Sequence, residues 1–369
     1  MPEWLQTLIR LLIPVVIILT LAPVGMMYLT WLERKVMARI QDRFGPNRVG
    51  PYGLLQPLAD GIKMLTKEDT VPDGADRLCH FLAPVAVVVP ALMLFTLLPF
   101  GPGLLAAPLA AGLLFFVALG STTTVALFMA GWGSRNKFSL LGAVRNAAQL
   151  IAYEVPMVLS LAVVPMAAGS LGMAEIVQTQ AGRWFVFTPW GAAAFLLVLI
   201  TGLAEVNRTP FDLPEAESEI VAGFHTEYSG MKFALFYMAE FLSTLALAAL
   251  LSVLFLGGWH GPRGPFLPGV VWGLFWMGLK TFLLVFVMIW IRGTFPRFRI
   301  DQLMGLAWKV MIPVSLANIL AAALWHFLPG WPGSLASLAL VAGTFLVTTQ
   351  LWLQPKPHLP THWVEATKR

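Results

Sequence analysis

Three acidic residues and one lysine lie inside long apolar stretches of this chain, where a charged side chain is costly. Glu154 and Glu240 each lie roughly 12–13 Å along a predicted helix from the nearest preceding basic residue, at 1.5 Å per residue. Glu205 closes the end of another apolar stretch, and Lys280 lies near the middle of a fourth. On insertion scales the four charges together cost on the order of 10 kcal/mol, so something must offset them.

Two interpretations of these residues are open. Ionisable groups within a membrane are by default candidates for a proton relay, here formed by Glu154, Glu205, Glu240 and Lys280. The structural alternative is that Glu154, Glu240 and Lys280 pair with one another and lock the packing of their helices. Both interpretations require the four residues to be carried on packed membrane helices.

A second group of acids follows Glu205 in a loop at about 206–232. The loop carries Asp212, Glu215, Glu217, Glu219 and Glu227, interleaved with Phe211, Leu213, Ile220, Val221 and Phe224. A plain solvated loop does not need the apolar residues, so we expect this acidic loop to fold inward. Packed carboxylates raise one another's pKa by repulsion and desolvation, which suits groups that exchange protons near neutral pH. The acids of this loop are therefore expected to be able to take up and release protons.

An amphipathic helix is predicted at about 53–67, in the first long loop. Its apolar side carries Leu54, Leu58, Ile62 and Leu65, and its polar side carries Gln56, Asp60, Lys63 and Lys67. This pattern is typical of a helix lying in the membrane interface. The helix either anchors the loop to the membrane surface, or forms a wall of a cavity for a lipid-soluble molecule, with Asp60 and Lys63 facing inward.

The elements that position these residues are membrane-spanning helices. Of the 369 residues, 58% are hydrophobic and 12% charged, against roughly 25% charged residues in a soluble chain. Apolar runs of about 20 or more residues recur along the chain, long enough for a helix to cross a membrane. They lack the short alternating pattern of a membrane β-barrel, so they predict an all-α bundle with one domain, 1–369. About nine spans are expected, near 8–31, 81–100, 105–131, 146–168, 187–206, 233–257, 270–292, 309–328 and 334–353.

Lysine and arginine fall almost entirely on one side of these spans. The other side holds only Arg10, Arg183 and Arg263. The positive-inside rule therefore predicts an external N-terminus and a cytoplasmic C-terminus. This topology accounts for the net charge of +5, so we expect no nucleic-acid partner. The first span is too long for the apolar core of a signal peptide, and its charges follow it, so we expect it to be retained.

Several redox classes are excluded for this chain alone. Its single cysteine, Cys79, excludes an intrachain disulfide, a thiolate zinc site and an iron–sulfur cluster. The histidines lie in loops or tails, except His326 near the end of a span, so facing haem ligands are not expected. We find no phosphate-binding loop or dinucleotide fingerprint. If electrons are involved, another subunit carries them.

Four motifs closely resemble one known family. They are Glu33-Arg34-Lys35, Arg43-Phe44-Gly45-Pro46-Asn47, the stretch from Gly53 to Lys63, and Pro210-Phe211-Asp212-Leu213-Pro214-Glu215-Ala216-Glu217-Ser218-Glu219. Over nearly its whole length the chain resembles the membrane quinone-chamber component, the H subunit, of respiratory NADH:quinone oxidoreductase, complex I. The stretch Gly223-Phe224-His225-Thr226-Glu227-Tyr228-Ser229-Gly230 adds to the resemblance.

The resemblance implies a membrane subunit that forms most of the membrane side of a quinone chamber and couples quinone reduction to proton translocation. It implies quinone as substrate, with no covalently bound or metal cofactor on this chain. The implied partners are the peripheral iron–sulfur and quinone-site subunits, the other membrane-arm subunits and membrane lipid. The implied location is the bacterial inner membrane. The residues implied near the quinone path are Arg34, Lys35, Arg39, Asp60, Lys63 and Phe224; the coupling acids are Glu154, Glu205, Glu215, Glu217, Glu227 and Glu240.

Three alternatives remain beside this interpretation. Membrane subunits of energy-converting hydrogenases share parts of the pattern without using quinone, although the complete acidic loop favours the quinone enzyme. An independent proton-coupled transporter would also bury carboxylates, but it should show broken helices in two related halves. A structural scaffold gives no reason for charges within spans. Members of the family usually have eight spans, so 334–353 is an additional ninth.

Overall fold

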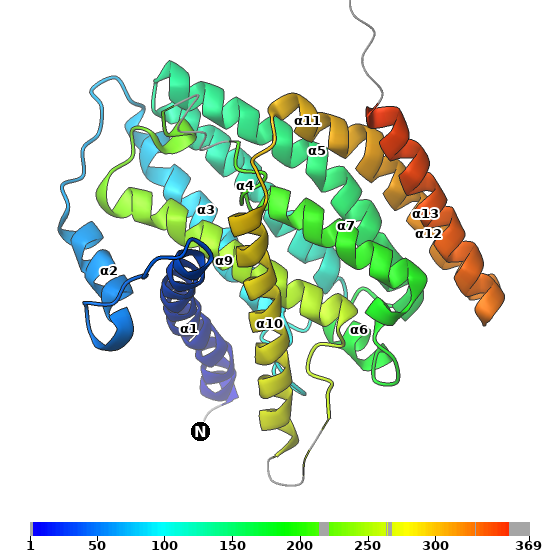
Figure 1. Ribbon diagram of the computed structural model, residues 1–369. Helices are drawn as coiled ribbons and strands as arrows, with labels where there is room; N and C mark the ends of the chain where they lie inside the picture. Colours follow the sequence, from blue (N-terminus) through cyan, green and yellow to red (C-terminus); the bar gives the residue numbers. More distant parts are fainter. Residues whose placement is uncertain (1–2, 214–220, 263, 265–267, 329, 354–369) are drawn as a thin grey trace, which may run out of the picture.

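The computed structural model describes residues 3–213, 221–262, 264, 268–328 and 330–353. Within these residues the chain is helical, apart from turns and one isolated β-bridge between Gly101 and Leu104. Eight helical segments are long and apolar enough to cross a membrane. A ninth apolar helix, α7, spans Pro189–Glu205 and coincides with the fifth predicted span. The all-α membrane bundle is therefore confirmed (Figure 1).

The eight long segments follow the predicted order. They are α1 (Glu3–Ile40), α3 (Arg77–Leu97), α4 (Gly112–Gly133), α5 (Lys137–Ala168), α9 (Gly230–Phe255), α10 (Gly269–Thr294), the continuous stretch of α11 (Ile300–Leu306), η4 (Ala307–Met311) and α12 (Ile312–Phe327), and α13 (Trp331–Leu353). Segment η4 is a π-helical turn that joins α11 to α12.

Some helix ends differ from the predicted spans for local reasons. Helix α1 continues past the apolar run to Ile40, so Glu33, Arg34 and Lys35 lie on a helix and not in a loop. Helix α5 begins at Lys137, where the side chain of Asn136 accepts the Phe138 N–H and caps the helix. Charged residues that hydropathy assigns to loops can therefore extend a membrane helix into the interface.

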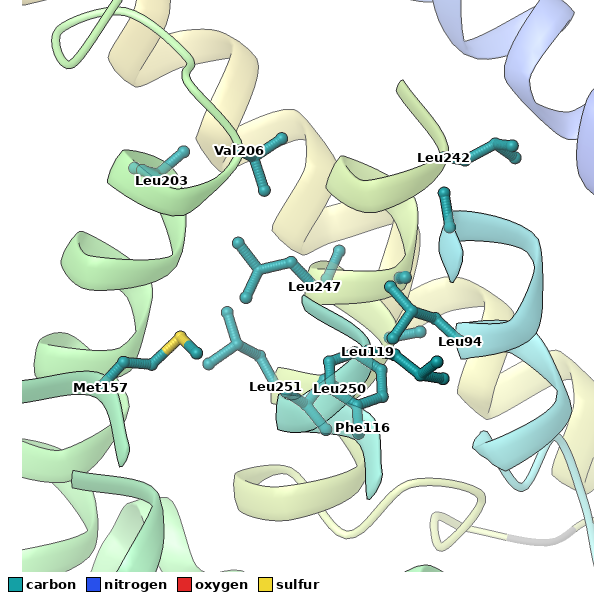
Figure 2. Close-up of a cluster of buried hydrophobic side chains, with 14 of the residues drawn as sticks. Leu94, Phe116, Leu119, Met157, Leu203, Val206, Leu242, Leu247, Leu250 and Leu251 are labelled. Atoms are coloured by element: carbon teal, nitrogen blue, oxygen red, sulfur yellow. The ribbon is translucent and has the colours of Figure 1, made fainter. Parts of the chain in front are cut away.

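Helix α9 lies at the centre of the bundle and is the most buried of the long described helices. It packs against α3, α10, α1 and α7. Leu247, Leu250 and Leu251 of α9 meet Leu119 of α4 and Met157 of α5 in the core (Figure 2). The apolar residues of this one helix therefore connect helices that are distant in the sequence.

Helices α1 and α13 lie at the edges of the bundle, and most of their apolar side chains are exposed. Helix α13 packs mainly on α12. Its buried side carries small residues, Gly333, Ser337 and Thr348, and the Ser337 hydroxyl donates to the Ala321 carbonyl at 2.7 Å. Small residues at this spacing let two membrane helices approach closely.

The amphipathic helix is present as α2, Gln56–Thr66, preceded by the short turn η1, Pro51–Gly53. Leu58, Ile62 and Leu65 are exposed along it, as expected for a side that faces lipid. Helix α2 contacts α1 and α9. On the opposite end of the bundle, the short helix α6, Met173–Thr179, and the turn η2, Phe185–Phe187, connect α5 to α7.

Candidate functional site

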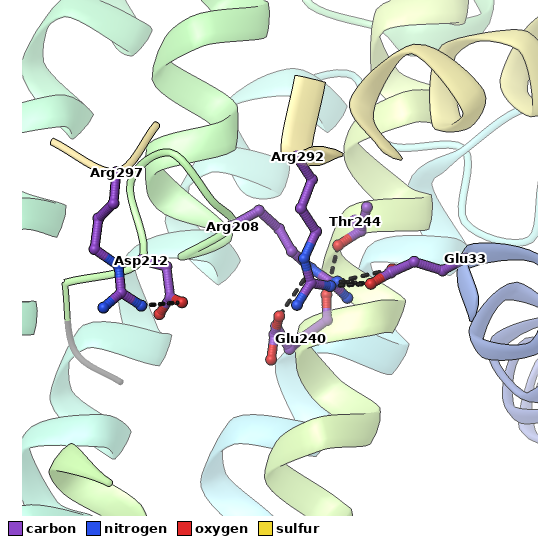
Figure 3. Close-up of polar contacts among 7 residues, drawn as sticks. All are labelled: Glu33, Arg208, Asp212, Glu240, Thr244, Arg292 and Arg297. Carbon is purple, nitrogen blue, oxygen red and sulfur yellow. Dashed lines mark hydrogen bonds and ion pairs between the residues drawn. The ribbon is translucent and has the colours of Figure 1, made fainter. Parts of the chain in front are cut away.

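A buried cluster of charged side chains joins four segments of the chain (Figure 3). Arg208, at 4% exposure, donates through one terminal nitrogen to both carboxylate oxygens of Glu33, at 3.1 and 2.8 Å. Its Nε lies 2.8 Å from Oε1 of Glu240. Arg292 forms a second ion pair with Glu33. Two carboxylates and two guanidinium groups therefore form one network, which offsets the cost of burying Glu240.

Each member of this network comes from a different element. Glu33 projects from the extended end of α1, Glu240 from the buried α9, and Arg292 from the last turns of α10. Arg208 lies directly after α7, where its N–H donates to the Leu203 carbonyl and its guanidinium lies 3.9 Å from the ring centroid of Phe241. The polar residues that follow an apolar helix thus turn back into the bundle.

A cavity of about 860 Å³ opens beside this network. Glu33, Arg34 and Met37 of α1 form one wall, and Tyr237 of α9 and Arg292 of α10 form another. The first loop contributes residues 43–48, and α2 contributes Gln56. The cavity therefore meets the ion network at Glu33 and Arg292.

The end of α1 is tied to the amphipathic helix. Arg34 pairs with Asp60 at 2.5 Å, and the Gln56 amide donates to the other oxygen of Asp60 at 3.0 Å. Partial burial favours the neutral acid, but the hydrogen bonds from Arg34 and Gln56 and the nearby positive charges outweigh it and lower the pKa of Asp60. Asp60 is thus held ionised against Arg34, whereas Lys63 is exposed.

The other two basic candidates on α1 lie along its end without a carboxylate partner among the described residues. The Lys35 ammonium is 5.9 Å from the ring centroid of Trp31, and the Arg39 guanidinium is 5.4 Å from that of Phe44. Of the six predicted quinone-path residues, only Arg34 lines the cavity beside Glu33.

Glu154 and Glu205 form a separate acidic pair next to α4. The Ser121 hydroxyl donates to Glu154, and the carboxylate of Glu205 lies against Gly120, where an added Cβ would come within 2.5 Å of it. The two carboxylates are close enough to repel each other electrostatically. The small side chains at positions 120 and 121 of α4 thus leave room for two acids from α5 and α7.

The acidic loop folds inward where it is described. Phe211, Leu213 and Phe224 are buried, whereas Val221 is exposed. The Phe224 carbonyl accepts the Ser139 hydroxyl at 2.8 Å, and Asp212 pairs with Arg297 at 2.7 Å. These contacts confirm the inward fold for three of its apolar residues and show it to be wrong for Val221.

The remaining acids of the loop divide into described and undescribed ones. Glu227 accepts the side-chain amide of Asn136 at 2.6 Å, and its carbonyl oxygen lies 3.4 Å from the ring of His80. The His80 ring stacks on that of Tyr228 at 4.1 Å. Ile220 and three acids of the loop, Glu215, Glu217 and Glu219, lie outside the described residues.

Lys280 lies apart from all of these acids. Its ammonium donates to the carbonyls of Leu256, Gly258 and His260 at 2.6, 2.9 and 2.6 Å and lies 4.2 Å from the ring centroid of Trp184. These carbonyls follow the end of α9 opposite to Glu240, roughly 24 Å away along the helix. The alternative in which Glu154, Glu240 and Lys280 pair with one another is therefore wrong, because each has other partners.

Sequence reasoning missed the roles of Glu33, Arg208 and Arg292 in the network. In the sequence, Glu33 stands out only as part of the motif Glu33-Arg34-Lys35. Arg208 and Arg292 belong to the basic residues that indicate the orientation of the chain in the membrane, so nothing marks them as partners of a buried acid. The sequence feature that could have identified Arg208 is its position directly after an apolar helix and just before the acidic residues of the loop. Over the described residues, no group of three histidine, cysteine or acidic side chains could hold a metal ion.

Comparison with known proteins agrees with this arrangement. The family described as NADH dehydrogenase matches residues 13–323, which include every described residue of the network and end before α13. The H subunit of NADH-quinone oxidoreductase from Dehalococcoides mccartyi (strain CBDB1) is 48% identical, covering 85% of this chain and 86% of its own.

Two further relatives carry corresponding names. The H subunit of NADH-quinone oxidoreductase that is numbered 1 in Geobacter metallireducens is 50% identical over 82% of this chain and 91% of its own. The H subunit from Rubrobacter xylanophilus is 51% identical over 80% of this chain and 89% of its own. The chain therefore belongs to the NADH dehydrogenase family, among the integral membrane H subunits of NADH-quinone oxidoreductase, complex I.

Proposed function

We propose that this chain forms the membrane side of a quinone chamber and couples quinone reduction to proton translocation through its buried carboxylates. The observation that carries the proposal is the meeting of the 860 Å³ cavity with the ion network at Glu33 and Arg292. Quinone is the substrate, consistent with the enzyme for which the relatives are named. The same names favour the quinone enzyme over an energy-converting hydrogenase.

The chemistry of quinone reduction explains why charged groups should line this cavity. A quinone that takes two electrons becomes negatively charged on its oxygens and takes up two protons. The guanidinium groups of Arg34 and Arg292 at the cavity wall would attract that negative charge. A change of charge in the cavity would then alter the pairing of Glu33 with Arg208, and through Arg208 that of Glu240.

We propose that the relay continues from Glu240 to the acidic pair. Arg208 contacts Glu240 and lies three residues after Glu205, which in turn is close to Glu154. Glu215, Glu217 and Glu227 of the acidic loop stay predicted members of this relay. A part for Lys280 also stays a prediction, although its three carbonyl contacts support a structural role.

We propose that quinone reaches the cavity from the membrane, past α2 and the end of α1. Asp60 would act through its ion pair with Arg34, and Lys35 and Arg39 would lie on the approach. Lys63 and Phe224 do not line the cavity, so their proposed place near the quinone path rests on the family resemblance.

The proposed topology has the N-terminus outside and the C-terminus in the cytoplasm of a bacterial inner membrane. The cavity and the acidic loop then lie on the cytoplasmic side. Peripheral iron–sulfur subunits would close the chamber from that side and supply the electrons, because we propose that this chain has no redox centre of its own. The change in charge on this chain would in turn act on the other membrane-arm subunits.

Photo-crosslinking of an azido-quinone in native membranes tests the chamber. We expect label on peptides within 34–67 and 205–230 that excess quinone removes. Arg34→Gln should reduce the label, whereas Glu175→Gln, at an exposed acid on the opposite end of the bundle, should not. Label found only on a partner subunit would contradict the proposal.

The relay requires a separate test. Glu205→Gln and Glu240→Gln should each lower proton pumping and quinone reduction in the assembled complex. Wild-type rates of both processes in both variants would rule out the relay while leaving the chamber intact.

A further inference from the structure

A second cavity, of about 450 Å³, lies at the end of the bundle opposite the acidic loop. The end of α5, the connection from α6 to α7 and the end of α12 surround it. Its apolar walls include Met166, Ala167, Phe185, Ala322 and Ala323. This end lies at the bottom of the bundle in Figure 1, where α6 is labelled. The cavity shares no residue with the proposed quinone chamber.

Aromatic residues place this cavity at the boundary between lipid and water. Trp184 directly precedes the turn η2, Trp325 lies near the end of α12 and Trp331 begins α13. Trp190, in the first turn of α7, lines the cavity but is buried within the bundle. Tryptophan concentrates at the headgroup level of membranes, where its ring is apolar and its N–H is polar. A molecule in the cavity would therefore have its polar part at the headgroups and its apolar part among the chains.

One cation stands at the polar side of the cavity. The Arg183 guanidinium is exposed, and one of its nitrogens donates to the Phe187 carbonyl at 2.7 Å. No carboxylate in the described part of the chain forms an ion pair with Arg183. Thr179, Thr188 and His326 also contribute polar side chains to the lining.

The chemistry of this lining selects an anionic, amphiphilic ligand. A guanidinium group binds a phosphate through two parallel hydrogen bonds. Arg183 is also among the few basic residues on a side that is otherwise nearly free of them. Its position therefore does not follow from the charge pattern that orients the chain.

We propose that this cavity binds an anionic phospholipid, with its phosphate on Arg183 beside His326 and the start of one acyl chain along Ala167 and Ala323. The lipid would bridge α5, the α6–α7 connection and α12. This site would stabilise the end of α7 that is remote from Glu205. The proposal is independent of the proposed quinone chemistry.

A photoactivatable phosphatidylglycerol tests the site in the assembled complex, reconstituted in phosphatidylcholine vesicles. We expect label on peptides within 166–188 and 322–327. Arg183→Gln should lower the label about fivefold, the factor expected for one cation near anionic lipid. Arg183→Lys should retain most of the label because the charge remains.

Two further variants separate charge from shape. Ala323→Phe fills the apolar wall without changing a charge and should also lower the label. Lys309→Gln removes an exposed cation from the turn η4, in the half of the same helical segment that is remote from the cavity, and should leave the label unchanged. In each variant the amount of label is divided by the amount of assembled complex.

Three results would overturn the proposal. The first is equal labelling by a photoactivatable phosphatidylcholine, which would show an ordinary lipid shell. The second is an unchanged label in both Arg183→Gln and Ala323→Phe. The third is crosslinking of these peptides to another subunit, which would show that protein covers the cavity.

Discussion

Replacement of Arg208 by methionine should destabilise the chain strongly, because its charge compensates two buried carboxylates. Glu33 would retain Arg292, but Glu240 would keep no cationic ion-pair partner within the described residues. Removing one partner of a buried ion pair costs about 3–5 kcal/mol. We therefore expect the destabilisation to come mainly from the unpaired, buried carboxylate of Glu240.

A double-mutant cycle identifies the cause of this loss. Glu240→Gln alone leaves Arg208 paired with Glu33, so it should cost less than Arg208→Met. The double variant Arg208→Met/Glu240→Gln should be about 1–3 kcal/mol more stable than the sum of the single effects, because no buried charge is orphaned.

The free energy of unfolding of the full chain is measured by titration with sodium dodecyl sulfate in mixed micelles, followed by tryptophan fluorescence. Lys232→Met is the control, because the carboxylate that it leaves unpaired, Asp69, is 47% exposed and water can solvate it, so the loss should cost about 1 kcal/mol or less. A cost below about 1 kcal/mol for Arg208→Met, or strict additivity in the cycle, would refute the reasoning.

Three further predictions concern contacts outside this network. Burial lowers the pKa of His225 to about 4, so the unfolded chain binds the extra proton, and the free energy of unfolding should fall by about 2–3 kcal/mol as pH falls from 6.5 to 4. His225→Phe should remove this part of the pH dependence, and an unchanged pH dependence would contradict the prediction. Lys280→Met should cost about 2–4 kcal/mol by leaving three carbonyls without their donor, and unaltered SDS resistance would argue against the structural role. Gly142→Ala places a Cβ 2.7 Å from the Gly223 Cα and should cost about 1–3 kcal/mol and displace the acidic loop. In Gly278→Ala, where the added Cβ meets nothing within 4 Å, stability should not fall; equal losses in both variants would show that the close approach is unimportant.

The sequence by itself determined the order and helical type of the long apolar segments. Hydrophobic runs of about 20 residues have one stable solution in lipid, a helix that satisfies its own backbone hydrogen bonds. The amphipathic helix and the candidate acids Glu154, Glu205 and Glu240 were equally visible, because a charge stands out in an apolar run. Helix ends were less predictable, since caps such as Asn136 and charged extensions such as the end of α1 do not change hydropathy.

Only the tertiary structure decided which charges meet. Glu33 and Arg292 are separated by most of the chain, and no periodicity links either residue to Arg208. Their pairing depends on how α1, α9 and α10 pack and on the turn that follows α7. The same packing separates Lys280 from Glu240 and leaves the 860 Å³ cavity open beside Glu33. Ion pairs act over a few ångströms, so their partners are set by three-dimensional packing and not by spacing along the chain.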